Sequence, residues 1–418
     1  MISAAGCAGK EAPPLTPTPT PIVISTPLES AEAILNQIEV EVSGIRGLSP
    51  KTEIEPQFVT RQELKALLDR DFAENNPAGE LRVEQAELVM LDLLPANYDL
   101  SGSLLQLSEE QVIGFYDDNT NEMVVLGNVS QIAAQEKLTI AHEYDYALEN
   151  QTFDLQSLPL HDRVNSDLAL AALSVAEGDA TLVMMLYAYR YLGLDVIGEL
   201  AGSPALGNNT AFDAAPPVIK ETLLFPYVQG TEFVTSIFLQ GGWTAVNRLY
   251  SDLPKFTEQI LHPEKYLANE QPEEVTIPNL MEVLGDRWSE LDSSVLGELY
   301  ISIYLEAFVD NSTATKAAEG WSGDRYVFYE DANKRDLLLL RSTWDTSQDA
   351  QEFFDAYLLF VENKSKGTWP LLLNTQDKRW WEAPDQSVYM SKQGSDILII
   401  LGPDETTLTN ILPQFTAT

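Results

Sequence analysis

The stretch Ala-His-Glu-Tyr-Asp-Tyr-Ala-Leu-Glu-Asn-Gln, residues 141–151, carries more information than any other part of this chain. Residues 135–150 contain neither Pro nor Gly and place apolar side chains at helical spacing, which predicts a helix. Side chains four residues apart on a helix lie on the same face. His142 and Tyr146 are therefore expected to lie side by side.

His142 and Glu143 match the first half of the HExxH pattern, in which two His bind zinc and the Glu activates a metal-bound water. Tyr146 stands at the position of the second His. A phenol has a reference pKa of about 10, so it is a poor ligand at neutral pH unless the metal drives its deprotonation. A His-Glu pair on an amphipathic helix is also common without a metal, so the pattern alone is weak support for zinc.

A second acidic stretch, Glu177-Gly178-Asp179, lies within an Ala/Leu-rich segment. A carboxylate from a second helix often completes a zinc site. Burying a carboxylate in an apolar helix is costly unless the group is paired or bound to a metal. Glu177 is therefore a candidate third ligand, and the alternative is that Glu177 and Asp179 form a solvent-exposed stripe.

Several short motifs accompany these residues. They are residues 114–117, 142–144, 147–148, 151, 153–155, 177–181, 226–227, 241–243 and 257–266. Together they resemble a family of bacterial secreted zinc metallopeptidase-like lipoproteins of the gluzincin kind, over roughly residues 40–270. The resemblance implies an α+β protein with a mostly helical zincin-like peptidase domain and a small β-hairpin or edge sheet. It also implies His142 as first zinc ligand, Glu143 as general base and Glu177 as third ligand.

The resemblance fails at four neighbouring positions. The family carries Thr, His, Gln and Asp where this chain has Asp145, Tyr146, Glu149 and Asn150. Four departures within six residues indicate that selection on the metal has relaxed. Zinc is therefore expected to be bound weakly or not at all.

Two functions remain open at this point. The favoured one is a metallopeptidase-like surface lipoprotein, catalytically impaired, that binds a peptide or protein ligand. The alternative is an active zinc-dependent endopeptidase that uses His142, Glu177 and a substitute ligand, either Tyr146 or Glu149.

Three further features bear on substrate contacts. Residues 114–126 predict a β-hairpin, whose edge strand could hold a substrate backbone by strand addition. His262 and Tyr227 each neighbour a Pro and could donate to an oxyanion. For His262 a structural hydrogen bond is the favoured interpretation, and for Tyr227 a packed aromatic. His161 is expected at the surface or at a helix cap.

The amino terminus resembles a bacterial lipobox, Ala4-Ala5-Gly6-Cys7, which makes residues 1–7 the remnant of a signal peptide. Residues 8–29 are rich in Pro and Thr and predict a semi-rigid linker. Cys7 is the only Cys among 418 residues, so no disulfide framework is expected and lipidation is its predicted use. These signals predict an extracytoplasmic protein, lipid-anchored to the bacterial cell membrane or surface.

The composition is strongly acidic, with 25 Lys and Arg against 64 Asp and Glu and a formal net charge of −39. The electrostatic field of so negative a protein repels nucleic acid and anionic membranes, so neither is an expected partner. The one expected membrane contact is through the lipid anchor. No uncharged apolar run reaches the ~18 residues of a membrane-spanning helix.

The division of the chain is predicted at residue 272, with a peptidase-like domain over residues 30–272 and a smaller α+β domain over 273–418. The first should contain helices at residues 31–47 and 60–72 and a helix beginning at Ser108. The second should contain strands and helices in alternation. Its predicted strands are residues 326–329, 337–340, 388–390 and 397–401, and its predicted helices are 295–309, 347–362 and 405–412.

Overall fold

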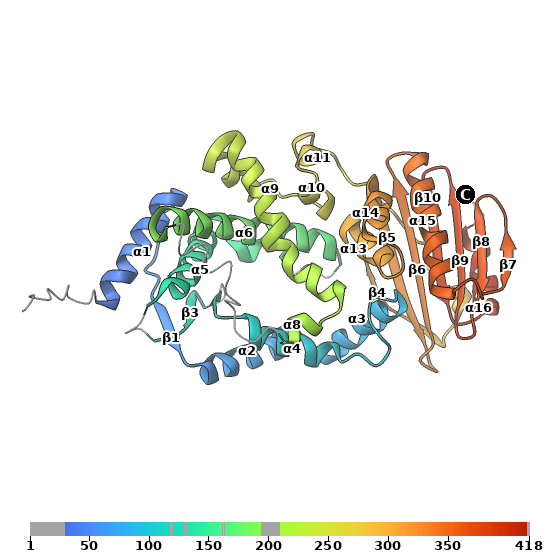
Figure 1. The fold of residues 1–418 in the computed structure, drawn as a ribbon. Coiled ribbons are helices and arrows are strands. Elements are labelled where there is room, and N and C mark those ends of the chain that lie inside the picture. The colour runs from blue at the N-terminus through green and yellow to red at the C-terminus, as the bar shows by residue number, and fades with distance from the viewer. Residues whose placement is uncertain are drawn as a thin grey trace, which may run out of the picture.

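A computed structural model of the chain describes residues 30–117, 120–128, 132–160, 162, 164–193 and 210–415. The fold is mixed α+β, with helices and a small sheet in the first part and a large antiparallel sheet in the second (Figure 1). Cys7, the linker at residues 8–29 and His161 lie outside the described residues.

Four helices, with strand β1 (Pro56–Val59) between the first and the second, form the beginning of the described chain. They are α1 (Ala31–Arg46), α2 (Arg61–Asn75), α3 (Ala78–Met90) and α4 (Leu100–Gln111). The helices predicted at residues 31–47 and 60–72 are confirmed as α1 and α2. The start predicted at Ser108 is wrong, because Ser108 lies in the last turn of α4. That helix begins eight residues earlier, where the Asp99 side chain accepts a hydrogen bond from the Gly102 amide.

A three-stranded sheet lies beside these helices. Its strands are β1 (Pro56–Val59), β2 (Gly114–Asp117) and β3 (Glu122–Leu126), in the order β1-β3-β2. The predicted hairpin is confirmed, because β2 and β3 pair antiparallel. Strand β1 pairs with the other side of β3 in parallel, which leaves β2 at the edge of the sheet.

The predicted helix over residues 135–150 is confirmed as α5 (Ala134–Phe153). It packs against α6 (Ser166–Tyr187), which continues into a π-helical turn, Ala188–Leu192. Helix α6 in turn packs against the long α9 (Pro217–Leu249). Gly178 makes that close crossing possible, since a Cβ there would lie 2.4 Å from the Gly230 carbonyl oxygen of α9.

Three short helices complete this part: α8 (Thr210–Ala214), α10 (Thr257–Leu261) and α11 (Pro263–Leu267). Among the described residues, one helical stretch, Ser166–Leu192, is long and apolar enough to cross a membrane by length and composition. In its most apolar window 61% of the residues are buried inside the fold. Burial of this kind is typical of the core helix of a globular domain.

The second part is built on a seven-stranded sheet of order β4-β5-β6-β10-β9-β8-β7. Its strands are β4 (Trp288–Ser294), β5 (Trp321–Asp331), β6 (Asp336–Trp344), β7 (Leu371–Asn374), β8 (Lys378–Glu382), β9 (Ser387–Gln393) and β10 (Asp396–Gly402). Its helices are α12 (Met281–Leu284), α13 (Gly297–Glu306), α14 (Asn311–Ala318), α15 (Ser347–Ser365) and α16 (Glu405–Ile411). The strands and helices predicted after residue 290 are confirmed in type and approximate position.

The run of four Leu residues in β6 shows why both faces of this sheet are covered. Successive side chains of a strand point to opposite faces. Leu338 and Leu340 join the cluster that contains α13 and α15, whereas Leu337 and Leu339 join a separate cluster with α16. All four are buried, so this strand is apolar on both sides.

The main apolar cluster extends across the predicted division at residue 272. It includes Val175 of α6 and Phe233 of α9 together with Ile301 of α13 and Phe353 of α15. Figure 1 shows α13 and α14 between the helical part and the large sheet. The two parts therefore share one continuous core.

Candidate functional site

The packing of α5 against α6 brings His142 and Glu177 together. Nε2 of His142 lies 3.2 Å from Oε2 of Glu177, and each side chain is 13% exposed. Two atoms bound to one tetrahedral zinc at ~2.0–2.1 Å lie about 3.3 Å apart. The two side chains thus occupy positions that suit two ligands of a common ion, but in this structure they contact each other directly.

Glu143 lies at the same place, next to the edge strand. Burial raises the pKa of its carboxyl to about 7, against the lowering effect of His142 and of a hydrogen bond with the backbone of Tyr116 in β2. The charge of Glu177 contributes to the increase. A carboxyl group with a pKa near neutrality can both accept and donate protons.

Tyr227 of α9 also lies at this site. Its ring centroid is 6.2 Å from that of His142, and 41% of the residue is exposed, so burial in the core does not account for its position. The negative charge of Glu177 is the main reason that the pKa of the Tyr227 hydroxyl is well above its usual range. His142, Glu143, Glu177 and Tyr227 together form what we call the His142 site.

Tyr146 does not complete a metal site of the usual kind. Its partly buried ring packs against both large apolar clusters of the first part. Two groups of three His, Cys, Asp or Glu side chains with ligand atoms within 4.8 Å occur in the described part of the chain, and neither contains His142 or Glu177. Catalytic zinc usually takes three protein ligands, so the donor set of the His142 site does not fit a catalytic zinc ion.

One of these groups consists of Asp145 and Glu149 of α5 with Asp179 of α6, all three fully buried at 0% exposure. We call it the Arg46 triad, because Arg46 of α1 donates to both carboxylate oxygens of Asp179, at 2.9 and 2.8 Å. The solvent-exposed stripe considered as an alternative is thus wrong for Asp179. Helix α1 covers the position where it was expected to meet water.

Only Asp179 has its hydrogen bonds satisfied in the Arg46 triad. It also accepts a hydrogen bond from the Tyr250 hydroxyl at 2.9 Å. Among the described residues, no atom meets hydrogen-bond geometry with the carboxylate oxygens of Asp145 and Glu149 or with Nη1 of Arg46. Unpartnered buried polar atoms are rare in native structures and indicate strain or a missing ion or water.

The pKa values of Asp145 and Glu149 are raised, as expected for buried carboxyl groups that lack hydrogen bonds. Burial and the charge of Asp179 raise the pKa of Asp145 to about 8, although Arg46 acts in the opposite direction. The pKa of Glu149 is raised well above its usual range by burial and by its two acidic neighbours. From the sequence, Asp145 was a departure from a family pattern, and Glu149 was both a departure and a possible substitute zinc ligand. Arg46 was not among the predicted site residues.

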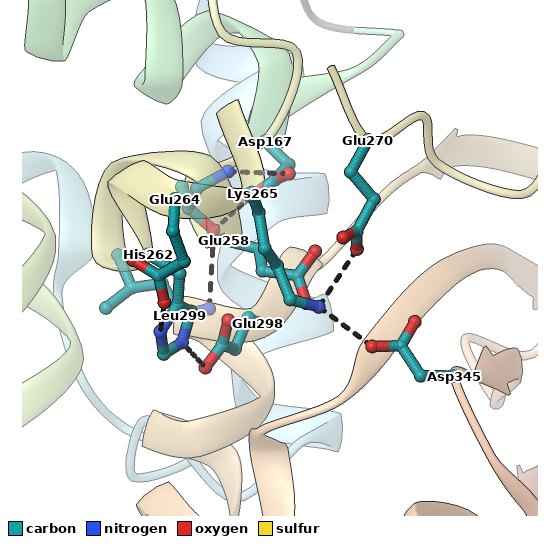
Figure 2. Close-up of polar contacts among 10 residues, drawn as sticks. Asp167, Glu258, His262, Glu264, Lys265, Glu270, Glu298, Leu299 and Asp345 are labelled. Carbon is teal, nitrogen blue, oxygen red and sulfur yellow. Dashed lines mark hydrogen bonds and ion pairs between the residues drawn. The ribbon is translucent and has the colours of Figure 1, made fainter. Parts of the chain in front are cut away.

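The other group contains Glu258, Glu270 and Asp345, and we call it the Lys265 triad. Figure 2 shows the Lys265 ammonium between these carboxylates, with Nζ–O distances of 2.5, 3.0 and 2.8 Å. Every carboxylate of this triad therefore contacts a fixed cation.

His262 lies beside the Lys265 triad. Its Nε2 is 3.0 Å from Oε1 of Glu298 in α13, and its Nδ1 is 3.8 Å from Glu264 (Figure 2). Asp167 of α6 accepts hydrogen bonds from the amide and hydroxyl of Thr257 nearby. The 257–266 motif is thus part of a polar network that joins α6, α10, α11 and α13.

A cavity of about 770 Å³ lies elsewhere, between α3 and the segment from β4 to α13. Its lining includes Glu84, Glu87 and Asp292, and burial raises the pKa of Glu87 to about 9. The residues of the His142 site are not part of this lining.

Comparison with known proteins gives one partial match. A family model described as a domain of unknown function, DUF8575, matches residues 283–412, which run from the end of α12 to the end of α16. Searches of curated proteins and of solved structures found no match.

Proposed function

We propose that residues 30–272 are a zincin-like, metallopeptidase-like module that no longer carries a catalytic zinc and binds a peptide or protein ligand. The observation that supports this most directly is Tyr146, which stands at the position of the second His and packs its ring against two apolar clusters. In a working zinc site a third ligand would stand at Tyr146, beside His142 and Glu177.

With no metal bound, His142 is held in its protonated form. Burial disfavours the imidazolium, but the hydrogen bond to Glu177 and the surrounding carboxylates outweigh it and raise the pKa of His142 to about 9. A metal would have to displace one of the two ring protons to bind there. His142 and Glu177 accordingly form an ion pair.

The edge strand supports a peptide ligand. In the described part of the chain, strand β2 pairs with β3 alone, and the backbone of Tyr116 makes a hydrogen bond with Glu143. An extended peptide could add to β2 as a further strand, with its side chains near Tyr227 and Glu143. Main-chain hydrogen bonds would then provide affinity without any bond being cleaved.

The predicted location is part of the same proposal. A lipid on Cys7 and the linker at residues 8–29 would hold the module outside the cytoplasm, at the bacterial cell membrane or surface, and the lipid would be its membrane contact. Metabolic labelling with a fatty-acid analogue tests this, since label should be incorporated by the unaltered chain and lost in Cys7→Ser.

Measurements of zinc content and of the cleavage of denatured casein test whether zinc binding and peptidase activity have been lost. The unaltered protein should contain no stoichiometric zinc and cleave nothing, whereas Tyr146→His should bind one zinc ion. Tyr146→Phe is the matched control, because it keeps the ring and offers no ligand. Stoichiometric zinc in the unaltered protein, with cleavage that Glu143→Gln abolishes, would establish the alternative of an active endopeptidase.

Binding to a library of unstructured peptides tests the remaining function. For each peptide that binds, a version with methylated backbone nitrogens is the matched control, because it keeps the side chains and loses the donors that strand addition needs. Affinity should fall sharply for the methylated peptides. Equal binding of both versions would exclude strand addition.

A further inference from the structure

The Arg46 triad has the properties of an ion site apart from the His142 site. Its three carboxylates offer ligand oxygens within 4.8 Å of one another, and all three residues are at 0% exposure. A cluster of acidic residues alone does not define a site. The second observation is that none of the four carboxylate oxygens of Asp145 and Glu149 has a partner at hydrogen-bond geometry among the described residues. Their neighbours are each other and the Tyr250 hydroxyl.

The charges of the Arg46 triad do not balance. Three carboxylates face one guanidinium, and that guanidinium is bound to Asp179 through two of its nitrogens. When Asp145 and Glu149 are ionised, they therefore add two negative charges that Arg46 does not neutralise. Uncompensated charge is very costly in a dry interior, so a neutralising partner is required.

We propose that Asp145, Glu149 and Asp179 bind one hard divalent cation, with Ca²⁺ as the best fit. One such ion supplies the two missing positive charges and accepts electron pairs from the four unpartnered oxygens. Oδ1 of Asp179, which accepts only from Nε of Arg46, keeps a lone pair for the ion as well.

The donor set selects the class of metal. All the ligand atoms are carboxylate oxygens, which suit Ca²⁺, Mg²⁺ and Mn²⁺ better than the softer transition metals. Mg²⁺ gives up its water reluctantly and requires near-ideal octahedral geometry, whereas Ca²⁺ accepts irregular sets of 6–8 oxygens. A fully buried site with carboxylates from two helices therefore favours Ca²⁺.

Calorimetry and thermal unfolding of the full chain test this proposal. The protein is first stripped of metal with a chelator at mildly acidic pH. When it is then titrated with Ca²⁺ at neutral pH, it should bind one Ca²⁺ per chain. Its unfolding temperature should rise by about 2–5 °C when Ca²⁺ is in large excess over the dissociation constant. Asp145→Asn and Glu149→Gln should each weaken Ca²⁺ binding by at least about 10–100-fold, the loss typical of disturbed metal shells.

Two controls separate this site from the others. Glu270→Gln changes the Lys265 triad and should leave the Ca²⁺ response unaltered, as should His142→Ala. Asp145→Asn reduces buried charge at constant shape, so it should unfold in chelator at a temperature no lower than the unaltered protein, which shows that it folds.

Three results would overturn the proposal. One is a chelated wild-type protein that shows neither heat of binding nor a shift in unfolding temperature with Ca²⁺, since protons would then be the neutralising partner. Another is a response to Ca²⁺ that Asp145→Asn retains in full. The third is a metal response that disappears in His142→Ala and survives in Asp145→Asn, which would place the ion at the His142 site.

Discussion

The Lys265 triad and the Arg46 triad each consist of three carboxylates beside one basic side chain, but the basic side chain contacts a different number of carboxylates in each. Each brings three carboxylates within 4.8 Å of one another. In the Lys265 triad one ammonium contacts all three carboxylates (Figure 2). In the Arg46 triad the guanidinium contacts Asp179 and leaves Asp145 and Glu149 without a hydrogen-bond partner.

The difference follows from the shape of the two cations. An ammonium is a compact charge with three donors that can point in three directions, so it can serve three carboxylates at once. A guanidinium is a planar fork that fits one carboxylate with two parallel hydrogen bonds. Arg46 is also confined between rings, with Trp243 at 4.6 Å. Residue type thus decides how many acids one buried cation can neutralise.

Removing the cation of the Arg46 triad should have the largest effect on stability. Arg46→Met leaves Asp179 buried without its partner, and breaking a buried ion pair in this way costs about 3–5 kcal/mol. Urea unfolding measures the loss. The unfolding free energy of Arg46→Lys should lie between those of the unaltered protein and Arg46→Met, because Lys restores the charge but not the paired hydrogen bonds. A loss below about 1 kcal/mol would contradict the role given to Arg46.

Removing the cation of the Lys265 triad should cost less, about 2–3 kcal/mol, because Glu270 and Asp345 retain contact with water. Lys265→Met leaves the buried Glu258 without compensation, and burial already raises the pKa of Glu258 to about 8 in the intact protein. The same urea series measures this loss. If Lys265→Met proved more harmful than Arg46→Met, burial would not be the deciding factor.

Neutralising one acid sharpens the contrast between the triads. In chelator, Asp145→Asn should leave stability unchanged or raise it by up to about 1 kcal/mol, because among the described residues Asp145 has no hydrogen bond to lose and its burial disfavours the charge. Glu258→Gln should lower it by about 1 kcal/mol, because it breaks a contact with Lys265. Thermal unfolding of both variants in the same buffer measures the two changes in stability. Equal destabilisation would mean that Asp145 is compensated after all.

The smallest effect concerns pH and His262, beside the Lys265 triad. The hydrogen bond to Glu298 raises the pKa of His262 despite burial, and Glu258 and Glu264 add to the increase. A raised folded-state pKa gives stability that is complete below the unfolded value of about 6.5 and is lost as pH rises through the folded value. We expect at most about 1 kcal/mol for this partly exposed pair.

The matched variant for this measurement is His262→Gln, which cannot become charged. The unfolding free energy of the two proteins should differ most below about pH 6 and converge as the solution becomes alkaline. Parallel curves across that range would show that His262 does not titrate with folding.

Helices and strands with a regular apolar repeat were predicted correctly from the sequence. Periodicity located α5 and the strands β5, β6, β9 and β10, because each carries a local apolar repeat. The family resemblance implied that Glu177 lies near His142, and the structure places the two side chains in contact at 3.2 Å. The start of α4 was missed because Ser108 imitates a helix cap inside a helix.

Both triads were beyond prediction for a physical reason. Arg46 and Asp179 are 133 residues apart, and Lys265 and Asp345 are 80 residues apart. No local repeat encodes such pairs, because they depend on how α1 packs on α6 and how α11 meets the large sheet. Asp145 and Glu149 were visible as unusual residues, but their burial opposite Asp179 required the fold.

Metal analysis of one sample tests the central contrast most directly. The protein is equilibrated with Ca²⁺ and Zn²⁺ together, dialysed, and analysed by elemental analysis and native mass spectrometry. One calcium and no zinc per chain are expected, because we propose a cation at the Arg46 triad and no catalytic zinc at the His142 site. One zinc and no calcium would contradict both conclusions.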